Sequence, residues 1–260
     1  MQAKTRARQA SRSRAAQWLA RAGLTARGVI YVLIGWVAIL IAIGHTSHAA
    51  DQQGALQLLA GKPYGLVSLW LLAIGFAAYA LWRLSEAAFG VVGEGNGAGP
   101  RLKSLGRAVV YAFFAVLTFK VISGTAHNQE RQQQDLTAKA MQHTGGQWLV
   151  GIVGLVLVVQ GFRRTFMKLL QTNRMSPRTR KIVEWLGVIG TVARGVVFAL
   201  AGVLVIEAAV THKAAKSGGI DKALLTLRNQ PFGEVLLFLA ALGLLIFGVY
   251  GLCEARWRRV

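Results

Sequence analysis

Long apolar runs separated by short basic blocks dominate the chain. Four runs carry no charged residue over a length that can cross a bilayer: 28–44, 64–82, 144–162 and 235–253. A spanning helix needs roughly 20 apolar residues for about 30 Å of hydrocarbon. Two further runs are interrupted by charge, 108–124 by Lys120 and 185–210 by Arg194 and Glu207. The pattern predicts six transmembrane helices and an all-α integral membrane fold.

The apolar runs also repeat in pairs. The first helix of each pair opens on one motif, which reads Arg27-Gly28-Val29-Ile30-Tyr31, Arg107-Ala108-Val109-Val110-Tyr111 and Arg194-Gly195-Val196-Val197-Phe198. The second helices of the first and last pairs match with identical spacing at Pro63-Tyr64-Gly65, Gly75 and Glu86, against Pro231-Phe232-Gly233, Gly243 and Glu254. The middle pair lacks this proline and this acid. Such repetition predicts three parallel two-helix units with pseudo-threefold symmetry.

The repeats divide the chain into five segments. These are a basic disordered tail at 1–14, repeat 1 at 15–90, a Gly-rich linker at 91–100, repeat 2 at 101–171 and repeat 3 at 172–260. Of the 30 Lys and Arg residues, 22 fall on the side that holds both termini and the segments 83–107 and 163–194. Because cytoplasmic loops are enriched in Lys and Arg, we expect both termini in the cytoplasm.

Several of these motifs together resemble a known family. They are the Arg-Gly-Val-Ile-Tyr opening at 27–31, the Gly-Ala-Leu to Pro-Tyr-Gly stretch at 54–65 and the Gly-x-x-x-Tyr-x-x-Trp-Arg exit at 75–83. In these three motifs the chain resembles the bacterial membrane family catalogued as domain of unknown function 1206. The resemblance implies tandem two-helix repeats in a multi-pass protein of the bacterial inner membrane, and it implies no established activity.

Composition and charge narrow the expected partners. The 260 residues are 54% hydrophobic and only 15% charged, which excludes an ordinary soluble domain. A net charge of +20 would favour nucleic acid in a soluble protein. Here the basic residues sit in short blocks between apolar runs, an arrangement typical of loops that face anionic lipid headgroups. We therefore expect membrane lipids, and no nucleic acid, as partners, and the sequence identifies no protein partner.

The repeat arginines Arg27, Arg107 and Arg194 are the first candidate site. A guanidinium at a helix entrance can reach phosphate headgroups or donate to a carboxylate of a neighbouring helix. Glu86 and Glu254 close the second helices on the same side and are the available carboxylates. The three arginines are accordingly interpreted as anchors and interhelix ties, or as a shared anion site on the threefold axis.

Polar residues within the apolar runs form a second candidate site. Thirteen positions after the repeat arginines, the units carry Leu40, Lys120 and Glu207. Lys120 and Glu207 can reach the outer headgroups, form an intramembrane ion pair or, with Gln160, belong to an ion or proton path. An unpaired charge there costs on the order of 3 kcal/mol, so pairing or contact with water is expected.

Histidines follow the outer ends of the first helices at His45, His127 and His212. Three imidazoles around a threefold axis would suit zinc or copper, but no metal-ligand spacing accompanies them, and we expect ordinary loop histidines and no cofactor. No catalytic set of residues is visible, so we expect no enzyme. The preferred function is a non-enzymatic membrane protein that acts through lipid or protein partners. A small channel or transporter with a path between the repeats is the alternative, and metal or cofactor binding by the histidines is a weaker one.

Overall fold

A computed structural model of the chain describes residues 14–46, 48–90, 97–126, 129–142, 176–217 and 219–257, together with six residues between 148 and 156. The described residues form helices, turns and bends, with no strand among them. The all-α class predicted from the sequence is therefore confirmed.

Five of the helices are long and apolar enough to cross a membrane. They are α2 (Arg14–Ala42), α4 (Gly65–Phe89), α5 (Ala98–Ile122), α8 (Pro177–Thr211) and α10 (Gly233–Trp257). At 1.5 Å per residue, a helix of 25 residues extends roughly 37 Å, which exceeds the hydrocarbon thickness. The chain thus has the helices of a multi-pass membrane protein.

Some boundaries differ from those predicted. α5 begins at Ala98, inside the linker predicted for 91–100, and the tail predicted for 1–14 ends where α2 begins at Arg14. α8 begins at Pro177, because the Ser176 hydroxyl caps its first turn by accepting from the Thr179 amide, and proline is tolerated in that turn. The span predicted for 144–162 lies largely outside the described residues.

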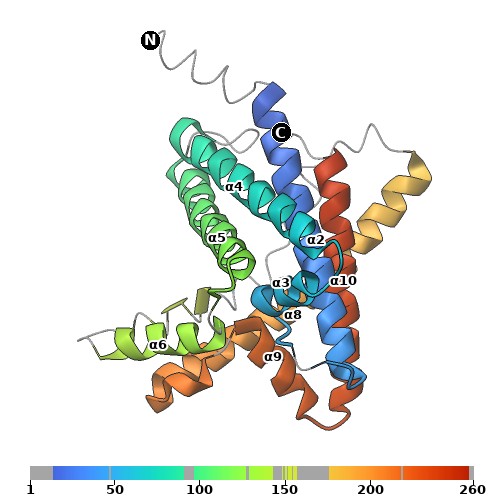
Figure 1. The fold of residues 1–260 in the computed structure, drawn as a ribbon. Helices are drawn as coiled ribbons and strands as arrows, with labels where there is room; N and C mark the ends of the chain where they lie inside the picture. Colours follow the sequence, from blue (N-terminus) through green and yellow to red (C-terminus); the bar gives the residue numbers. More distant parts are fainter. Residues whose placement is uncertain are drawn as a thin grey trace.

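Three shorter helices of the described residues lie between the long ones. They are α3 (Gln52–Ala60), α6 (Gln129–Met141) and α9 (Gly219–Arg228), and a 3₁₀ turn at Ala214–Lys216 precedes α9. Figure 1 shows α6 and α9 at the end of the molecule opposite to the start of α2 and the finish of α10. The long helices therefore have one end that carries the chain's terminal segments and one end that carries short helices.

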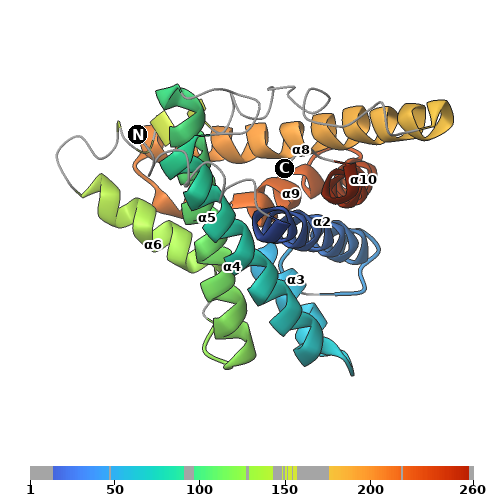
Figure 2. The same cartoon turned by 90° about the horizontal axis from the view of Figure 1, so that it is seen from above.

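The long helices pack in the order α5, α4, α2, α10, α8. Figure 2 shows α2 between α4 and α10, with α5 beyond α4 and α8 beyond α10. The most extensive contacts join α2 to α10 and α4 to α5. In each of these two pairs, the second helix of one repeat packs on the first helix of another.

Glycines in the second helices allow close approach within a repeat. A Cβ at Gly75 would lie 2.7 Å from the Ala26 Cβ, and one at Gly243 would lie 2.1 Å from the Ala193 Cβ. Ala26 and Ala193 each precede a repeat arginine. Repeats 1 and 3 therefore share the same helix contact, and small residues at such contacts let helix backbones pack closely in lipid.

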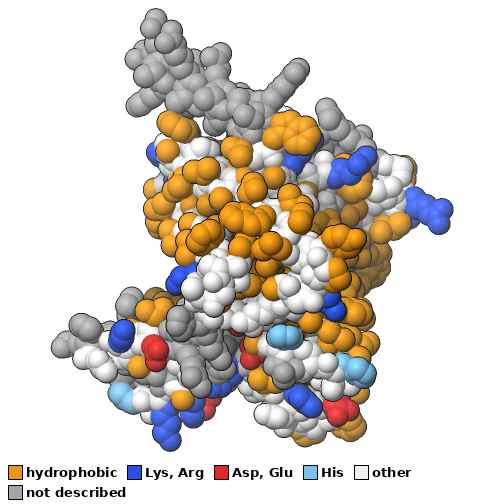
Figure 3. Space-filling model, viewed as in Figure 1, with side chains coloured by type: hydrophobic (Ala, Val, Ile, Leu, Met, Phe, Trp, Pro, Cys, Tyr) orange, Lys and Arg blue, Asp and Glu red, His pale blue; other side chains and the backbone are white. Residues whose placement is uncertain are grey.

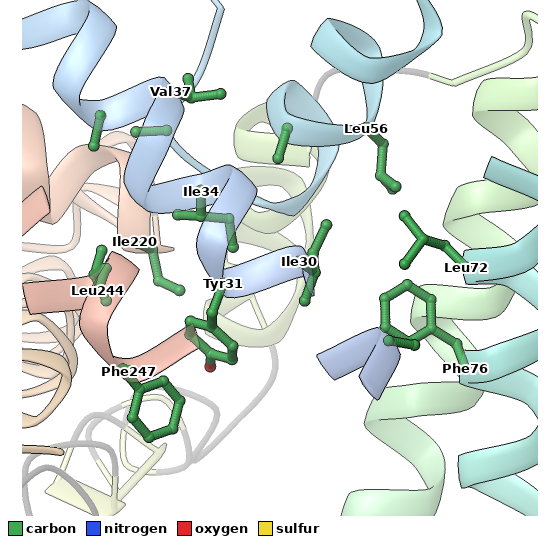
Figure 4. Packing of buried hydrophobic residues seen from close by; sticks show 14 of the residues in the cluster. Ile30, Tyr31, Ile34, Val37, Leu56, Leu72, Phe76, Ile220, Leu244 and Phe247 are labelled. Carbon is green, nitrogen blue, oxygen red and sulfur yellow. The ribbon is translucent and has the colours of Figure 1, made fainter. Parts of the chain in front are cut away.

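The core is continuous around α2. Ile30, Ile34 and Val37 of α2 are almost fully buried, and Figure 4 shows them between side chains of α3 and α4 on one side and of α9 and α10 on the other. Partners in this core include Leu56, Phe76 and Leu244. The inward face of α2 thus joins repeat 1 to repeat 3.

The outer surface has an apolar belt with aromatic side chains at both ends. Trp18 and Trp185, at matching positions in repeats 1 and 3, are 70% and 67% exposed. Tyr64 and Phe232, at matching turns at the other end, are 81% and 84% exposed. Figure 3 shows apolar side chains across the middle of one face, with the acidic side chains visible there at the end that holds α6 and α9. Such a belt is typical of a surface that faces lipid.

Candidate functional site

Arg27 joins the first long helix to the last. Its Nη1 donates to the Glu254 Oε2 at 3.2 Å, and the two side chains are 18% and 6% exposed. Its guanidinium also lies 5.1 Å from the centre of the Phe247 ring. The structure therefore brings together one repeat arginine and one of the two acids that the sequence offered as partners.

Arg194 lies in the same region but has different partners. Its Nε donates to the Tyr31 hydroxyl at 3.2 Å. Its guanidinium stands 4.2 Å from the centre of the Phe198 ring and 5.0 Å from that of Phe247. Both Arg27 and Arg194 thus contact the Phe247 ring, which lies in α10. We call Arg27, Arg194, Glu254 and these aromatic side chains the arginine cluster.

Glu86 has a different environment from Glu254. The expected contact with a repeat arginine is replaced by one with Arg83, whose Nη1 donates to the Glu86 Oε2 at 2.6 Å. The Ser104 hydroxyl of α5 donates to the same oxygen at 3.0 Å. Arg83 is only 1% exposed, and its Nη2 donates to the Tyr79 hydroxyl at 2.6 Å. This buried network ties repeat 1 to repeat 2.

Arg83 is a site residue that the sequence reasoning did not single out. The available signal was its spacing from Tyr79 and Glu86, at four and three residues along one helix, since side chains at such spacings are neighbours on a helix surface. Arg107, the middle repeat arginine, lies exposed on α5. The three repeat arginines therefore occupy three different environments.

Aromatic rings fill the space around the arginine cluster. Tyr31 and Phe247 meet edge to face at 4.8 Å between ring centres, and Tyr79 and Tyr111 do so at 4.4 Å. Tyr31 and Tyr111 hold the same position in repeats 1 and 2, four residues after the repeat arginine. Edge-to-face arrangements of this kind stabilise a packed interior beyond simple burial.

Lys120 and Glu207 are not joined by an ion pair in the described part of the chain. Glu207 instead accepts from the Lys216 Nζ at 2.5 Å, and these two side chains are 47% and 35% exposed. Lys120 is exposed in the last turn of α5. Gln160 lies outside the described residues. The polar residues proposed for a path thus lie, where they are described, on the surface.

His45 and His212 follow the ends of α2 and α8 at the end of the molecule that holds the short helices. His45 is exposed, with its Nδ1 2.8 Å from the Ile43 carbonyl oxygen, and His212 ends α8 in a left-handed conformation. His127 lies outside the described residues. Within the described ranges, no group of three or more His, Cys, Asp or Glu side chains is placed to hold a metal ion.

Comparisons with known proteins agree with the internal repetition. A family model described as Domain of Unknown Function (DUF1206) matches the chain three times, at residues 22–90, 102–167 and 189–258. An uncharacterized protein of Bacillus subtilis (strain 168), YxxB, is 30% identical over 250 residues, which cover 92% of this chain and 90% of that protein. No solved structure matches the chain. The family resemblance expected from the motifs is confirmed.

Proposed function

Because the chain belongs to the family described as Domain of Unknown Function (DUF1206), we propose a common role for its three repeats. Six spanning helices pack around a pseudo-threefold axis in the bacterial inner membrane, with both termini in the cytoplasm. The protein is not an enzyme and acts as a scaffold that binds anionic lipid or a protein partner.

The recurrence of helix contacts supports the threefold arrangement. The second helix of repeat 1, α4, packs on the first helix of repeat 2, α5, and the second helix of repeat 3, α10, packs on the first helix of repeat 1, α2. These are the same contact at two junctions of a ring. The second junction closes the ring between the last and the first repeat, as cyclic symmetry requires.

The packed interior is the observation that carries the scaffold role. The face of α2 that meets both α4 and α10 presents Leu24, Ile30 and Ile34, each 0–1% exposed. A conduit would place polar side chains or water along such a face. Apolar side chains fill it instead, and nearby Arg27 and Glu254 pair with each other.

The channel alternative has less support. It relies on Lys120 and Glu207, which are exposed rather than directed into the core, and Glu207 pairs with Lys216. The three-histidine alternative relies on His45 and His212, both exposed, and on His127. We therefore favour lipid or protein binding over transport or metal binding.

Basic side chains support a cytoplasmic lipid partner. The first turns of α8 expose Arg178, Arg180 and Lys181, and α2 exposes Arg21 near Trp18. Clusters of Lys and Arg next to a spanning helix attract anionic headgroups, with about 1 kcal/mol for each residue near the surface.

Two experiments test the proposal. Native mass spectrometry of the full chain, purified in a mild detergent, detects bound lipid, and affinity capture after crosslinking in cells detects a protein partner. We expect retained phosphatidylglycerol or cardiolipin, or one reproducible protein partner. The absence of both would overturn the proposal. Ion or solute flux is also measured in proteoliposomes. A flux that falls in Lys120→Ala or Glu207→Ala would favour the channel instead, provided that it does not fall in the control Lys103→Ala, which lies on α5 as Lys120 does.

A further inference from the structure

Arg194 is partly exposed, as Arg27 is, but differs from Arg27 and Arg83 in that it has no acidic partner among the described residues. Arg27 pairs with Glu254, and Arg83 pairs with Glu86. Among the described residues, Arg194 contacts the Tyr31 hydroxyl and aromatic rings, and no carboxylate lies within ion-pair distance.

The order of the repeats explains this difference. Glu254 of repeat 3 reaches Arg27 of repeat 1, the next repeat around the ring. At the junction of repeats 1 and 2, Glu86 pairs with Arg83 instead. A contact like that of Glu254 would bring an acid from repeat 2 to Arg194 of repeat 3. The sequence contains no Asp or Glu between Asp135 and Glu184. The second helix of repeat 2 therefore has no carboxylate for Arg194, whatever its position.

The guanidinium of Arg194 is oriented but not saturated. Arginine has five N–H donors in a planar fork, and the Nε–H is the one engaged, by Tyr31. The rings of Phe198 and Phe247 flank the guanidinium at 4.2 and 5.0 Å. These contacts hold the plane of the fork, and no acceptor in the described ranges engages its Nη groups, which are left for a further acceptor. Thr191, one turn earlier on the same face of α8, also has a buried hydroxyl oxygen without a partner among the described residues.

Charge in the arginine cluster is not balanced. Arg27 and Arg194 each lie about 5 Å from the centre of the Phe247 ring, and Glu254 is the acid that the structure places beside them. Two cations and one anion leave one positive charge. Charges inside a membrane protein are paired or reach water, because an isolated one is costly in a low dielectric.

We propose that Arg194 binds a phosphate group, with its Nη fork directed at two of the phosphate oxygens. Guanidinium groups match phosphate in this bidentate geometry. Arg194 is 17 residues before the end of α8 at Thr211, roughly 26 Å along the helix, so in the proposed topology it stands near the cytoplasmic headgroups. The phosphate belongs to an anionic phospholipid or is free in solution. This inference deepens the proposed function and rests on its membrane placement.

The test compares the full chain with two variants in lipid nanodiscs. Arg194→Gln removes the fork, and Lys103→Gln removes an equal charge from the exposed surface of α5. Thermal unfolding is followed by tryptophan fluorescence in phosphatidylcholine alone, with added phosphatidylglycerol, and with inorganic phosphate in the buffer. The wild type and Lys103→Gln should be stabilised in at least one of the two anionic arms. Arg194→Gln should show an apparent affinity about tenfold weaker or more in that arm.

The two arms identify the source of the phosphate, since a response to phosphatidylglycerol alone indicates a headgroup and a response to inorganic phosphate indicates a soluble anion. Arg194→Lys keeps the charge without the fork and should respond less than the wild type, so it serves as the test if Arg194→Gln does not fold. An equal response of the wild type and the Arg194 variants, or none from any of them, would overturn the site. Anionic lipid retained equally by wild type and Arg194→Gln would overturn this inference while the proposed scaffold role stands.

Discussion

Gly248→Ala would place a methyl group between α2 and α10, where repeat 1 contacts repeat 3. The Cβ of an alanine at this position would lie 2.5 Å from the Val32 backbone nitrogen and 2.8 Å from the Gly28 carbonyl oxygen. Ordinary Cβ contacts begin at 3.4 Å. Because both neighbours are backbone atoms of α2, no side chain can rotate away, and α2 and α10 must separate by up to about 0.9 Å.

The cost follows from two opposing contributions. Overpacking of a well-packed contact costs roughly 1–3 kcal/mol, and backbone neighbours place this contact near the upper value. Alanine has a better helix propensity than glycine, which returns at most about 1 kcal/mol. We expect Gly248→Ala to lower the free energy of unfolding by about 2 kcal/mol.

Gly106→Ala is the matched control. A Cβ at Gly106 meets no atom of the described residues within 4 Å, and the corresponding positions in repeats 1 and 3, Ala26 and Ala193, already hold alanine. This variant should be neutral or more stable by up to about 1 kcal/mol. Unfolding by SDS in mixed micelles, followed by circular dichroism, measures both. A Gly248→Ala protein as stable as the wild type, or an equal loss in Gly106→Ala, would refute the close α2–α10 contact.

Three further predictions concern two other contacts and the proposed orientation. Glu254→Gln should lower the free energy of unfolding by about 2 kcal/mol in the same SDS assay, because it leaves Arg27 without its acid. In a double-mutant cycle with Arg27→Gln the losses should not add, and additive losses would contradict the pair. Asp221→Ala should cost roughly 1–3 kcal/mol, since the Asp221 Oδ1 accepts from the buried Ala50 amide at 2.6 Å, and Asp221→Asn, which keeps an acceptor, should lose less. In a Cys253→Ser background, Tyr64→Cys should react with an impermeant maleimide on intact cells and Arg178→Cys only after permeabilisation; the reverse pattern would overturn the proposed orientation.

Apolar periodicity and repetition were sufficient to predict much of this fold. The span at 235–253 lies within α10, the span at 64–82 starts one residue before α4, and the span at 28–44 ends two residues after α2. Runs of this length without charge have few alternatives to a spanning helix. The helices extend beyond these spans where polar residues continue the helical pattern, as at the start of α8. Hydropathy does not report such extensions, since a helix end in water need not be apolar.

The short helices and the partners of the acids were harder to predict. α3 and α9 are amphipathic pieces of about ten residues, too short for their apolar positions to be distinguished from a loop with a few apolar residues. Whether Glu86 pairs with Arg83 or with a repeat arginine depends on how the side chains of three helices pack together. Repetition predicted that Glu86 and Glu254 are equivalent, but repeat 3 has Gly251 where repeat 1 has Arg83. That one difference gives Glu86 an arginine within its own helix.

The junctions of the proposed ring differ in how charge is handled. At the junction of repeats 1 and 2, Arg83 and Ser104 satisfy Glu86. Between repeats 3 and 1, Glu254 satisfies Arg27. Between repeats 2 and 3, the second helix of repeat 2 supplies no acid, and Arg194 contacts the Tyr31 hydroxyl and aromatic rings. In a symmetric scaffold, a structural ion pair would be expected at every junction, so the junction without one is the place where a ligand from outside the chain has the most to contribute.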